Sequence, residues 1–438
     1  MISAFDTQRR VVVTGLGVVS PLGNSADEFW QALIEGRSGV TAEESSSGEA
    51  TCVGAARKFE GKIDDFGPLE KDLKKTIRKA LKLMNRETQM GVAAAQQALH
   101  DSQLLSVGYE PERVGVCFGA GNVSMMPQDF EAGVRACSDA EHGFDFHRWG
   151  TEGLEQVAPL WLLKCLPNMP ACYMAIYNDL RGPNNSITQR EAAANLSVAE
   201  ACYAIQEGSA DAMVTGATGT TILPFNRLHA QLEGQVAAPV QNPETICRPF
   251  DRHRQGAVIA EGAAALVLEE YEAALDRGAT IYGEILGVGS SCVVSPGRVV
   301  GRRQALANAI GAALRKAHLS ADDIGHIHAH GLSTHRSDIE EAAAIRQVFG
   351  DRTSKLPLVA AKSNTGNAGA GSGALELVAS LLALRHGRLF PVLNYEEPDP
   401  QCPVAPVRSE DCAPGDSFVN LSIVAQGQAS CLAVGKCA

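Results

Sequence analysis

One stretch of the sequence has the residue types of a reactive turn. It runs from Leu180 to Glu191, contains the pair Gly182-Pro183 and a short β-branched segment, and leads into the helix-forming run Ala192 to Ile205. This order predicts a strand, a sharp bend and the start of a helix. Such a bend presents a side chain at a helix N-terminus, where backbone N–H groups and the helix dipole favour negative charge. The side chain presented there is that of Glu191.

Three histidines form a second pattern that could do chemistry. His326, His328 and His330 alternate along one predicted strand. Because alternate side chains of a strand point to the same face, the three imidazoles could bind a metal ion together. A strand bend at His330-Gly331 would break that shared face, so we expect no metal site.

Two glycine patterns resemble nucleotide-binding loops but lack residues that define them. Gly15 and Gly17 follow a predicted strand, yet Ser20 stands where a dinucleotide fingerprint has its third glycine. The glycines between Gly366 and Gly373 lack the Gly-Lys-Ser/Thr ending of a phosphate loop, and close helix packing explains them better. We therefore expect no cofactor.

The bulk composition limits the class of protein. The chain has 438 residues, 45% of them hydrophobic, which is enough for a large core and two or three domains. Its formal net charge is -12 and no basic block offsets the acid, which argues against nucleic acid or an anionic membrane as a partner. An acidic carrier protein would need a local basic patch, which Arg252 to Arg254 and the pair Arg302-Arg303 could supply.

The cysteines indicate the compartment. Twelve cysteines are scattered without C-x-x-C pairs, and no apolar run reaches the length of a membrane span. Cysteines of this kind are typical of reduced, buried thiols. We expect a cytoplasmic protein.

Strands and helices alternate along the chain in two successive series. Arg10 to Val13 predicts a strand that enters a turn at Gly15 and Gly17, and Leu73 to Leu104 predicts one long helix. Residues 121–166 mix short apolar pieces with tryptophans and are predicted to form an inserted helical cap. The alternation indicates a layered α/β protein whose two halves meet near Glu270.

Taken in order, several motifs resemble those of the β-ketoacyl-acyl-carrier-protein synthases, which are condensing enzymes of the thiolase superfamily. The motifs cover almost the whole chain and are Arg10 to Gly23, Pro167 to Met169, Arg181 to Asn184, Arg248 to Asp251 with Glu261-Gly262, Ala329 to Thr334 with Asp338, and Lys362 to Gly366. The resemblance implies the thiolase fold, in which two fused βαβαβαββ halves form a five-layer α-β-α-β-α sandwich. The halves would be residues 1–270, with the cap at about 121–166, and residues 271–438. It also implies a dimer.

The resemblance further implies a mechanism and the positions that serve it. In the family an elbow cysteine takes the acyl group, and two histidines stabilise the thioester oxygen of a malonyl group carried by acyl carrier protein. A lysine organises the site, and a glycine-rich C-terminal loop binds the acyl oxyanion. The matching positions in this chain are Glu191, His330, Asn367, Lys362 and the turn Ala425-Gln426-Gly427. The cysteine, the second histidine and most of the loop glycines are thus replaced.

These replacements restrict the chemistry. A carboxylate is a weak nucleophile and an acyl-glutamate would be a hydrolysable anhydride, so condensation through Glu191 is not expected. His330 and Asn367 match the His and Asn of other condensing enzymes, and both can donate to an enolate oxygen. Relatives with glutamine at the cysteine position resemble malonyl decarboxylases, whereas a glutamate would repel the malonyl carboxylate unless it is protonated. The helix N-terminus favours the ionised form of Glu191 by about 0.3–1 kcal/mol.

Three functions in fatty-acid or polyketide biosynthesis follow from the sequence. The favoured one is a chain-length-factor-like subunit that lacks the cysteine and forms a heterodimer with a cysteine-bearing synthase. One alternative is a malonyl-carrier-protein decarboxylase or other acyltransferase, as a homodimer or a heterodimer, that uses His330 and Asn367, with Glu191 as a candidate general base. The other is an acyl-binding protein without a catalytic role. The candidate catalytic residues are Glu191, His330, Asn367 and Lys362, and the candidate substrate-binding residues are Ala425, Gln426 and Gly427.

Overall fold

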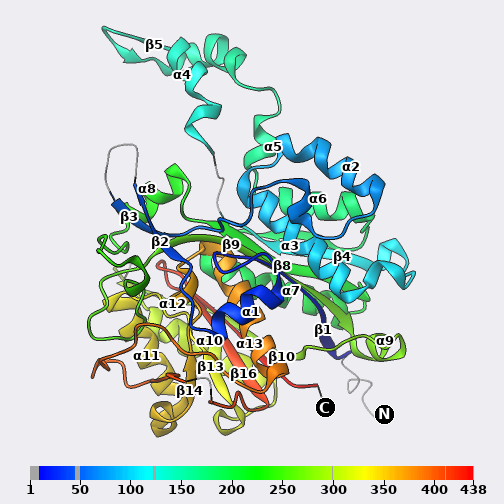
Figure 1. Cartoon of the computed structure of the whole chain (residues 1–438), viewed down its shortest axis with the longest axis vertical. Coiled ribbons are helices and arrows are strands. Elements are labelled where there is room, and N and C mark those ends of the chain that lie inside the picture. The colour runs from blue at the N-terminus through cyan, green and yellow to red at the C-terminus, as the bar shows by residue number, and fades with distance from the viewer. Residues whose placement is uncertain (1–8, 45–49, 122–124, 298, 410, 438) are drawn as a thin grey trace.

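The strands of the chain join in one large sheet with two leaves (Figure 1). The computed structural model describes residues 9–44, 50–121, 125–297, 299–409 and 411–437. The first leaf has the order β7 (Asn184–Ile187), β4 (Val114–Gly119), β8 (Ala212–Thr220), β9 (Ile259–Glu270) and β1 (Val11–Val19). The second leaf has the order β10 (Gly283–Cys292), β17 (Gln428–Gly435), β16 (Ser417–Ile423), β13 (His326–His328), β14 (Pro357–Val359) and β15 (Ala405–Pro406).

Strand β1 is the junction of the two leaves. It pairs antiparallel with β9 from Val11 to Val19, whereas its pairing with β10 involves Val12 and Val13. The seam between the leaves is therefore short, and the leaves can diverge far enough to hold helices between them. A small hairpin of β2 (Val40–Glu44) and β3 (Ala50–Gly54) extends the first leaf through parallel pairing of β3 with β9.

Helices form three layers around the two leaves (Figure 1). The outer face of the first leaf is covered by α3 (Arg86–Ser102) and α6 (Met169–Asn178), and that of the second by α10 (Arg302–Lys316) and α11 (His335–Phe349). Between the leaves lie α7 (Ala193–Gln206) and α13 (Ser372–His386), whose apolar side chains join both leaves in one cluster. The predicted α-β-α-β-α layering is confirmed.

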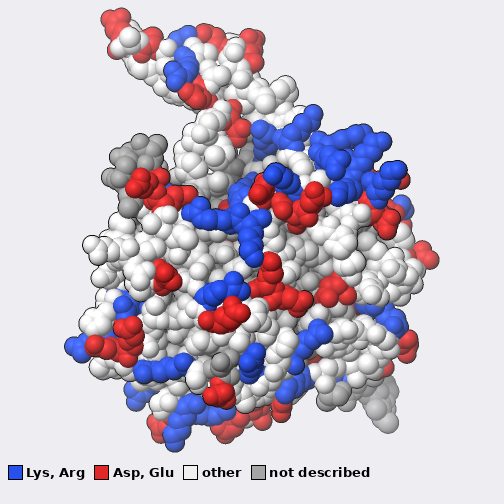
Figure 2. Space-filling model, viewed as in Figure 1, with Lys and Arg blue, Asp and Glu red and all other residues white. Residues whose placement is uncertain are grey.

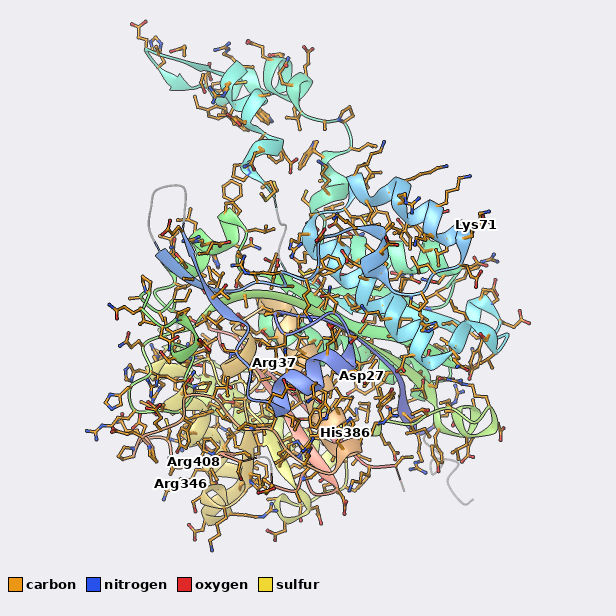
Figure 3. All side chains as sticks on the ribbon, viewed as in Figure 1. Asp27, Arg37, Lys71, Arg346, His386 and Arg408 are labelled. Carbon is orange, nitrogen blue, oxygen red and sulfur yellow. The ribbon has the colours of Figure 1, made fainter. Side chains whose placement is uncertain are left out.

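The remaining helices are short and lie around these layers. They are α1 (Ala26–Ile34), α2 (Lys71–Ala80), α4 (Glu131–Ala136), α5 (Trp161–Cys165), α8 (Pro224–Leu232), α9 (Tyr271–Asp276) and α12 (Lys362–Thr365). Helix α1 packs on the end of α13, where Trp30 stacks on His386 with ring centroids 4.9 Å apart. Figure 3 labels His386 and, on α1, Asp27.

Strand β1 is continuous, so the predicted turn at Gly15 and Gly17 is wrong. Both glycines lie against α3, where a Cβ on Gly15 would collide with the backbone oxygen of Ala98 and one on Gly17 with that of Ala94. The two glycines thus allow a strand and a helix to approach closely, which is a second use of glycine within a strand. Turn chemistry and close packing have the same signature in sequence.

The predicted helix from Leu73 to Leu104 is two helices. Helix α2 ends in a short 3-10 turn, and α3 begins after Asn85, whose side chain accepts a 2.8 Å hydrogen bond from the backbone N–H of Thr88. This cap satisfies an amide that has no partner within the helix. Ile77 and Met90 belong to the same hydrophobic cluster on the two sides of the break, which explains why the apolar pattern runs through it.

Part of the segment 125–166 protrudes from the body as an arm (Figure 1). The arm holds α4 and a hairpin of β5 (Ser138–Asp139) and β6 (Gly143–Phe144), whereas α5 packs on α6 of the body, so the predicted helical cap also contains strands. Phe130 lies between Trp149 and Trp161, with ring centroids 6.5 and 5.0 Å away. Residues 122–124 of the predicted insertion lie outside the described residues. Among the described ranges, no helix combines the length and the apolar character needed to cross a membrane.

Candidate functional site

Glu191 lies at the bend between β7 and α7, and we call the residues Gln189 to Ala192 of this bend the elbow. The chain turns at Arg190, which has a φ of +50°, a left-handed conformation that few non-glycine residues adopt. A 3-10 turn of Arg190 to Ala192 then leads into α7. The predicted order of strand, bend and helix is confirmed, and it leaves Glu191 with 8% of its surface exposed.

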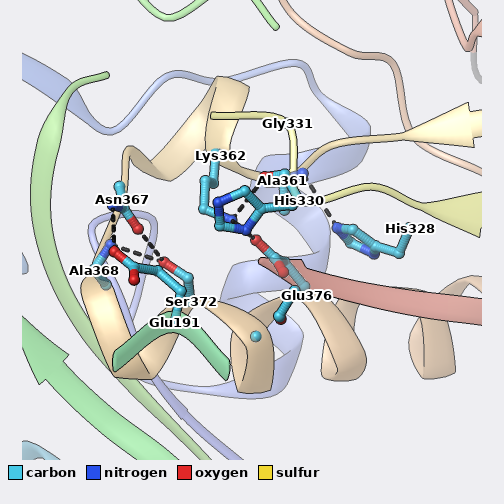
Figure 4. A network of polar contacts seen from close by, with 12 residues as sticks. Glu191, His328, His330, Gly331, Ala361, Lys362, Asn367, Ala368, Ser372 and Glu376 are labelled. Atoms are coloured by element: carbon cyan, nitrogen blue, oxygen red, sulfur yellow. Dashed lines mark hydrogen bonds and ion pairs between the residues drawn. The ribbon is translucent and has the colours of Figure 1, made fainter. Parts of the chain in front are cut away.

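The carboxylate of Glu191 contacts an amide from the other half of the chain (Figure 4). Nδ2 of Asn367 donates to Oε1 of Glu191 at 3.3 Å. Oδ1 of Asn367 accepts from the backbone N–H of Gly369 at 3.2 Å and from the hydroxyl of Ser372 at 3.1 Å, which fixes the orientation of the amide. Oε2 of Glu191 lies 3.7 Å from Nε of Arg190 and makes no hydrogen bond to any residue within the described ranges.

Lys362 is the centre of a buried polar cluster beside this pair (Figure 4). Its Nζ donates to the backbone oxygen of His330 at 2.7 Å, pairs with Oε1 of Glu376, and lies 3.2 Å from Nδ1 of His330. An ammonium group has three N–H donors, so these three acceptors satisfy it fully. If Nδ1 of His330 accepts from Lys362, the proton of a neutral ring must be on Nε2.

Electrostatics supports the neutral ring. Burial holds the pKa of His330 well below its usual range, and the positive charges of Lys362 and Arg302 lower it further. Burial also raises the pKa of Glu376, an effect that Lys362 partly offsets. His330 is therefore a neutral imidazole that can donate from Nε2.

Glu341 positions the chain around His330. Its two carboxylate oxygens accept from the backbone N–H groups of His330 at 2.7 Å and Gly331 at 2.9 Å. Burial raises the pKa of Glu341 to about 8. The bend predicted at His330-Gly331 is present, since β13 ends at His328 and Gly331 has a φ of +49°.

His326 and His328 have a structural role that differs from that of His330. Nε2 of His328 accepts from the backbone N–H of Ala361 at 3.2 Å, and its Nδ1 lies 2.8 Å from the hydroxyl of Ser380. The same hydroxyl lies 3.0 Å from Nε2 of His326, whose Nδ1 lies 2.8 Å from the oxygen of Pro414. The two rings thus form a chain of hydrogen bonds through Ser380. Within the described ranges, no group of three or more metal-ligating side chains comes together.

The C-terminal turn closes one side of the site. Val424 to Gln428 connects β16 to β17, with a backbone hydrogen bond of 2.9 Å from Gly427 to Val424. Gly427 has a φ of +94°, a conformation that favours glycine. The side chain of Gln426 donates to Glu233 at 3.2 Å and therefore points toward the end of α8.

A cavity of about 400 Å³ lies between the elbow, α11 and this turn. Glu191, His330 and Ala425 line it together with Arg190 and Arg302. No cysteine is among the described residues that line it. Of the seven residues predicted from sequence, three thus face one cavity.

The other predicted residues lie directly behind it. Lys362 contacts His330, Asn367 contacts Glu191, and Gln426 and Gly427 form the turn that carries Ala425. Sequence reasoning missed Glu376, Glu341, Arg190 and Glu233. Arg190 is next to Glu191, and Glu341 and Glu376 follow the motifs that end at Asp338 and Gly366, so closeness to a motif could have identified these three. No motif lies close to Glu233 in the sequence.

The basic patch expected at Arg252 to Arg254 lacks one of its two arginines. Arg254 is fully buried, where it donates to Asp399 at 2.7 Å, because the carboxylates of Asp338 and Asp399 compensate its charge. Arg302 lines the cavity and pairs with Glu340. On the face shown in Figure 2, cations gather instead over α2 and its end. Figure 3 labels one of them, Lys71, and the others that are exposed are Lys75, Arg78, Lys79 and Lys82.

Comparison with known sequences gives a consistent result. The profile of the β-ketoacyl synthase N-terminal domain matches residues 8–274, and that of the β-ketoacyl synthase C-terminal domain matches residues 282–396. The 3-oxoacyl-(acyl-carrier-protein) synthase 2 of Synechocystis sp. is 32% identical over 419 residues, which are 94% of this chain and 92% of that protein. Its counterpart in Coxiella burnetii is 35% identical over 400 residues, or 90% of each chain.

Solved structures share the whole fold. A chain of a type II polyketide synthase acyl-carrier protein in complex with its ketosynthase, bound to the hexaketide, aligns with a TM-score of 0.83 and 27% identity, over 99% of this chain and 100% of that chain. The ishigamide ketosynthase/chain length factor aligns with a TM-score of 0.79 and 28% identity, over 99% and 100%. A β-ketoacyl synthase from Burkholderia phymatum aligns with a TM-score of 0.80 and 28% identity, over 98% and 100%. The predicted thiolase fold is confirmed.

Proposed function

The chain belongs to the β-ketoacyl synthase family, and from this premise we propose that it is a chain-length-factor-like subunit, the partner of a cysteine-bearing synthase in fatty-acid or polyketide biosynthesis. The observation that carries the proposal is the side chain at the elbow. Glu191 occupies the bend where the family resemblance places the nucleophilic cysteine, and no described residue lining the cavity beside it is a cysteine. This subunit does not take an acyl group itself.

The surroundings of Glu191 support a structural carboxylate. Asn367 donates to one of its oxygens, and the guanidinium of Arg190 lies near the other. The same amide cannot donate that N–H to a thioester oxygen while it is bound to Glu191. Glu191 and Asn367 stand at the two positions where the family resemblance places a nucleophile and a donor to the thioester oxygen. In this chain the two side chains instead bind each other.

The partners follow from the relatives and from surface charge. The ishigamide structure is described as a ketosynthase/chain length factor, and another similar structure contains a ketosynthase with its acyl-carrier protein. By analogy, this subunit forms a heterodimer with a synthase and works with acyl carrier protein. The exposed cations of α2 offer an acidic carrier a complementary surface on a chain whose net charge is -12.

The test combines affinity purification with intact-mass measurement. The tagged chain is purified from a host that also expresses a cysteine-bearing synthase and a carrier protein, and the complex is offered an acetyl thioester. We expect a heterodimer in which the acyl adduct is found on the synthase alone. A homodimer that becomes acylated, or that makes a condensation product without a second synthase, would refute the proposal.

A Glu191→Cys variant is the matched control. A thiol at the helix N-terminus has a lowered pKa and is a good nucleophile. If the missing thiol is what prevents acylation, this variant should gain an acetyl adduct that the wild type and a Glu191→Ala variant do not gain. Equal masses for all three would show that access, and not the residue at the elbow, prevents the reaction.

Decarboxylation of a malonyl group is the second candidate, and the state of His330 favours it. Lys362 and burial together hold the ring neutral with its proton on Nε2, and His330 lines the cavity. A donor at that position would stabilise an enolate oxygen as carbon dioxide leaves. Asn367 would be the second donor to that oxygen. The negative charge of Glu191 would repel the malonyl carboxylate and slow the reaction.

Carbon dioxide release from malonyl-carrier protein by the purified chain tests this candidate. Turnover that is abolished in His330→Ala and raised in Glu191→Gln would establish it, since the glutamine removes the repelling charge. Absence of release from both the wild type and Glu191→Gln would reject it. The partner role would then stand on the heterodimer measurement alone.

A further inference from the structure

Arg190 connects three separate parts of the chain at the elbow. Its Nη1 and Nη2 donate to the two carboxylate oxygens of Glu233, at 2.6 and 2.9 Å. Nη1 also lies 3.4 Å from Oε1 of Gln426, and Nε2 of Gln426 donates to Glu233 at 3.2 Å. Glu233 caps the end of α8, and Gln426 belongs to the turn after β16. We call Arg190, Glu233 and Gln426 the arginine latch.

Arg190 of the latch lines two cavities. The cavity of about 400 Å³ described above is lined by Arg190, Glu191 and Glu233. A second cavity of about 80 Å³, beneath α8, is lined by Arg190 and Glu191 as well, together with Asn226 and His229. Since the same two residues line both, they form the wall between them. Only the first cavity lies within the range of about 300–1,000 Å³ that is usual for ligand sites.

We propose that Arg190 determines which ligands the site accepts, because the arginine latch closes the passage between the two cavities. A ligand that enters the large cavity then ends at the wall formed by Arg190 and Glu191. The identification of that ligand as an acyl thioester rests on the proposed function, whereas the latch rests on its contacts alone. The site accepts the thioester end and a short acyl group, and it excludes a long chain.

Charge and geometry keep the latch closed. The bidentate pairing of a guanidinium with a carboxylate is the strong form of a charge-assisted hydrogen bond. The side chains of Arg190 and Glu233 are 23% and 19% exposed, so water screens the pair only in part. The hydrogen bond from Arg190 holds the pKa of Glu233 below its usual range, which keeps the pair ionised at neutral pH. An apolar chain gains nothing by displacing a paired charge, because the charge would then be buried alone.

Amide hydrogen exchange tests the latch itself. Arg190→Met removes the charge and retains a long side chain, and Glu233→Gln weakens the pair from the other side with little change of shape. We expect both variants to exchange faster than the wild type at the end of α8 and in the turn of residues 424–427. Arg181→Met is the control, since Arg181 also forms ion pairs, with Asp179 and Glu112, but lies before β7, at the end of that strand remote from Arg190, and lines neither cavity. Equal exchange in Arg190→Met and Arg181→Met would overturn the proposal.

Binding of S-acyl-pantetheines of increasing chain length tests the wall. For the wild type and Arg181→Met, affinity should stop rising once the acyl group fills the large cavity. For Arg190→Met, it should continue to rise, by about fourfold for each added methylene that becomes buried. A wild-type affinity that rises with every methylene would overturn the proposal, and so would identical profiles for the wild type and Arg190→Met, including the case in which neither binds. Neither measurement requires a synthase, so failure of the heterodimer proposal would not affect them.

Discussion

Replacing Lys362 with methionine should destabilise the fold strongly. Lys362 and Glu376 are each 1% exposed, and they pair directly. Removing one partner of such a pair leaves a buried charge without compensation, at a cost of about 3–5 kcal/mol. The variant also leaves the backbone oxygen and Nδ1 of His330 without the donor that both contact. We therefore expect the free energy of unfolding at neutral pH to fall by at least the lower of these values.

The loss of stability in the Lys362→Met variant should depend on pH, and the protonation of Glu376 determines whether it grows or shrinks as the pH rises. Burial raises the pKa of Glu376 above its ordinary value of 4.5, and Lys362 lowers it, so the methionine variant raises it further. Above pH 4.5 the folded variant then retains a proton that the unfolded chain has lost. Its stability falls by about 1.4 kcal/mol per pH unit until the folded pKa is reached. The deficit relative to the wild type should thus be smallest in acid and grow toward neutral pH.

Urea unfolding followed by tryptophan fluorescence and circular dichroism measures this deficit at several pH values. The double variant Lys362→Met with Glu376→Leu is the matched control, because it removes the stranded charge together with its partner. It should recover most of the lost stability, since an apolar pair of similar volume is often as stable as a buried ion pair. A single variant within about 1 kcal/mol of the wild type at neutral pH, or a double variant less stable than the single, would refute this reasoning.

Three further predictions concern other parts of the fold. Gly17→Ala should lower the free energy of unfolding by about 1–3 kcal/mol or more, because the added methyl group would collide with the backbone of α3. Gly150→Ala is the control, since a methyl group there meets nothing within 4 Å, and urea or thermal unfolding should show no comparable loss. Burial raises the pKa of Glu341 from 4.5 to about 8, so between these pH values the folded chain holds a proton that the unfolded chain has lost. The stability of the wild type should therefore fall as the pH rises from 4.5 to about 8, and Glu341→Gln should make stability depend less on pH in this range. Lys75→Glu with Lys79→Glu on α2 should slow association with an acidic carrier protein by about tenfold at low salt, with no difference at high salt, as stopped-flow kinetics would show.

The candidate site combines groups that stabilise negative charge with one that carries it. His330 and Asn367 are donors, whereas Glu191 is an acceptor that already binds one of them. An active condensing site would leave those donors free for the substrate. The internal contact between Glu191 and Asn367 therefore supports the partner role proposed above.

Local sequence signals were sufficient for much of the fold. The Gly-Pro turn, the β-branched segment and the alanine-rich run placed Glu191 at the start of a helix, because bends and helix starts depend on residues a few positions apart. The alternation of strands and helices predicted the layered class for the same reason. Where one local pattern serves two structures, the prediction was wrong: Gly15 and Gly17 fit a turn and also a strand packed closely on a helix.

The sequence by itself determined that the bend before α7 holds a glutamate, and the proposal of a subunit that forms no acyl-cysteine rests on that residue. Only the tertiary structure decided what that glutamate and its neighbour contact. Asn367 is 176 positions from Glu191 and Gln426 is 236 from Arg190, and no local pattern connects them. These pairs meet because α7 and α13 lie between two leaves of one sheet, and the side chains that touch across those layers depend on packing, which spacing along the chain does not encode.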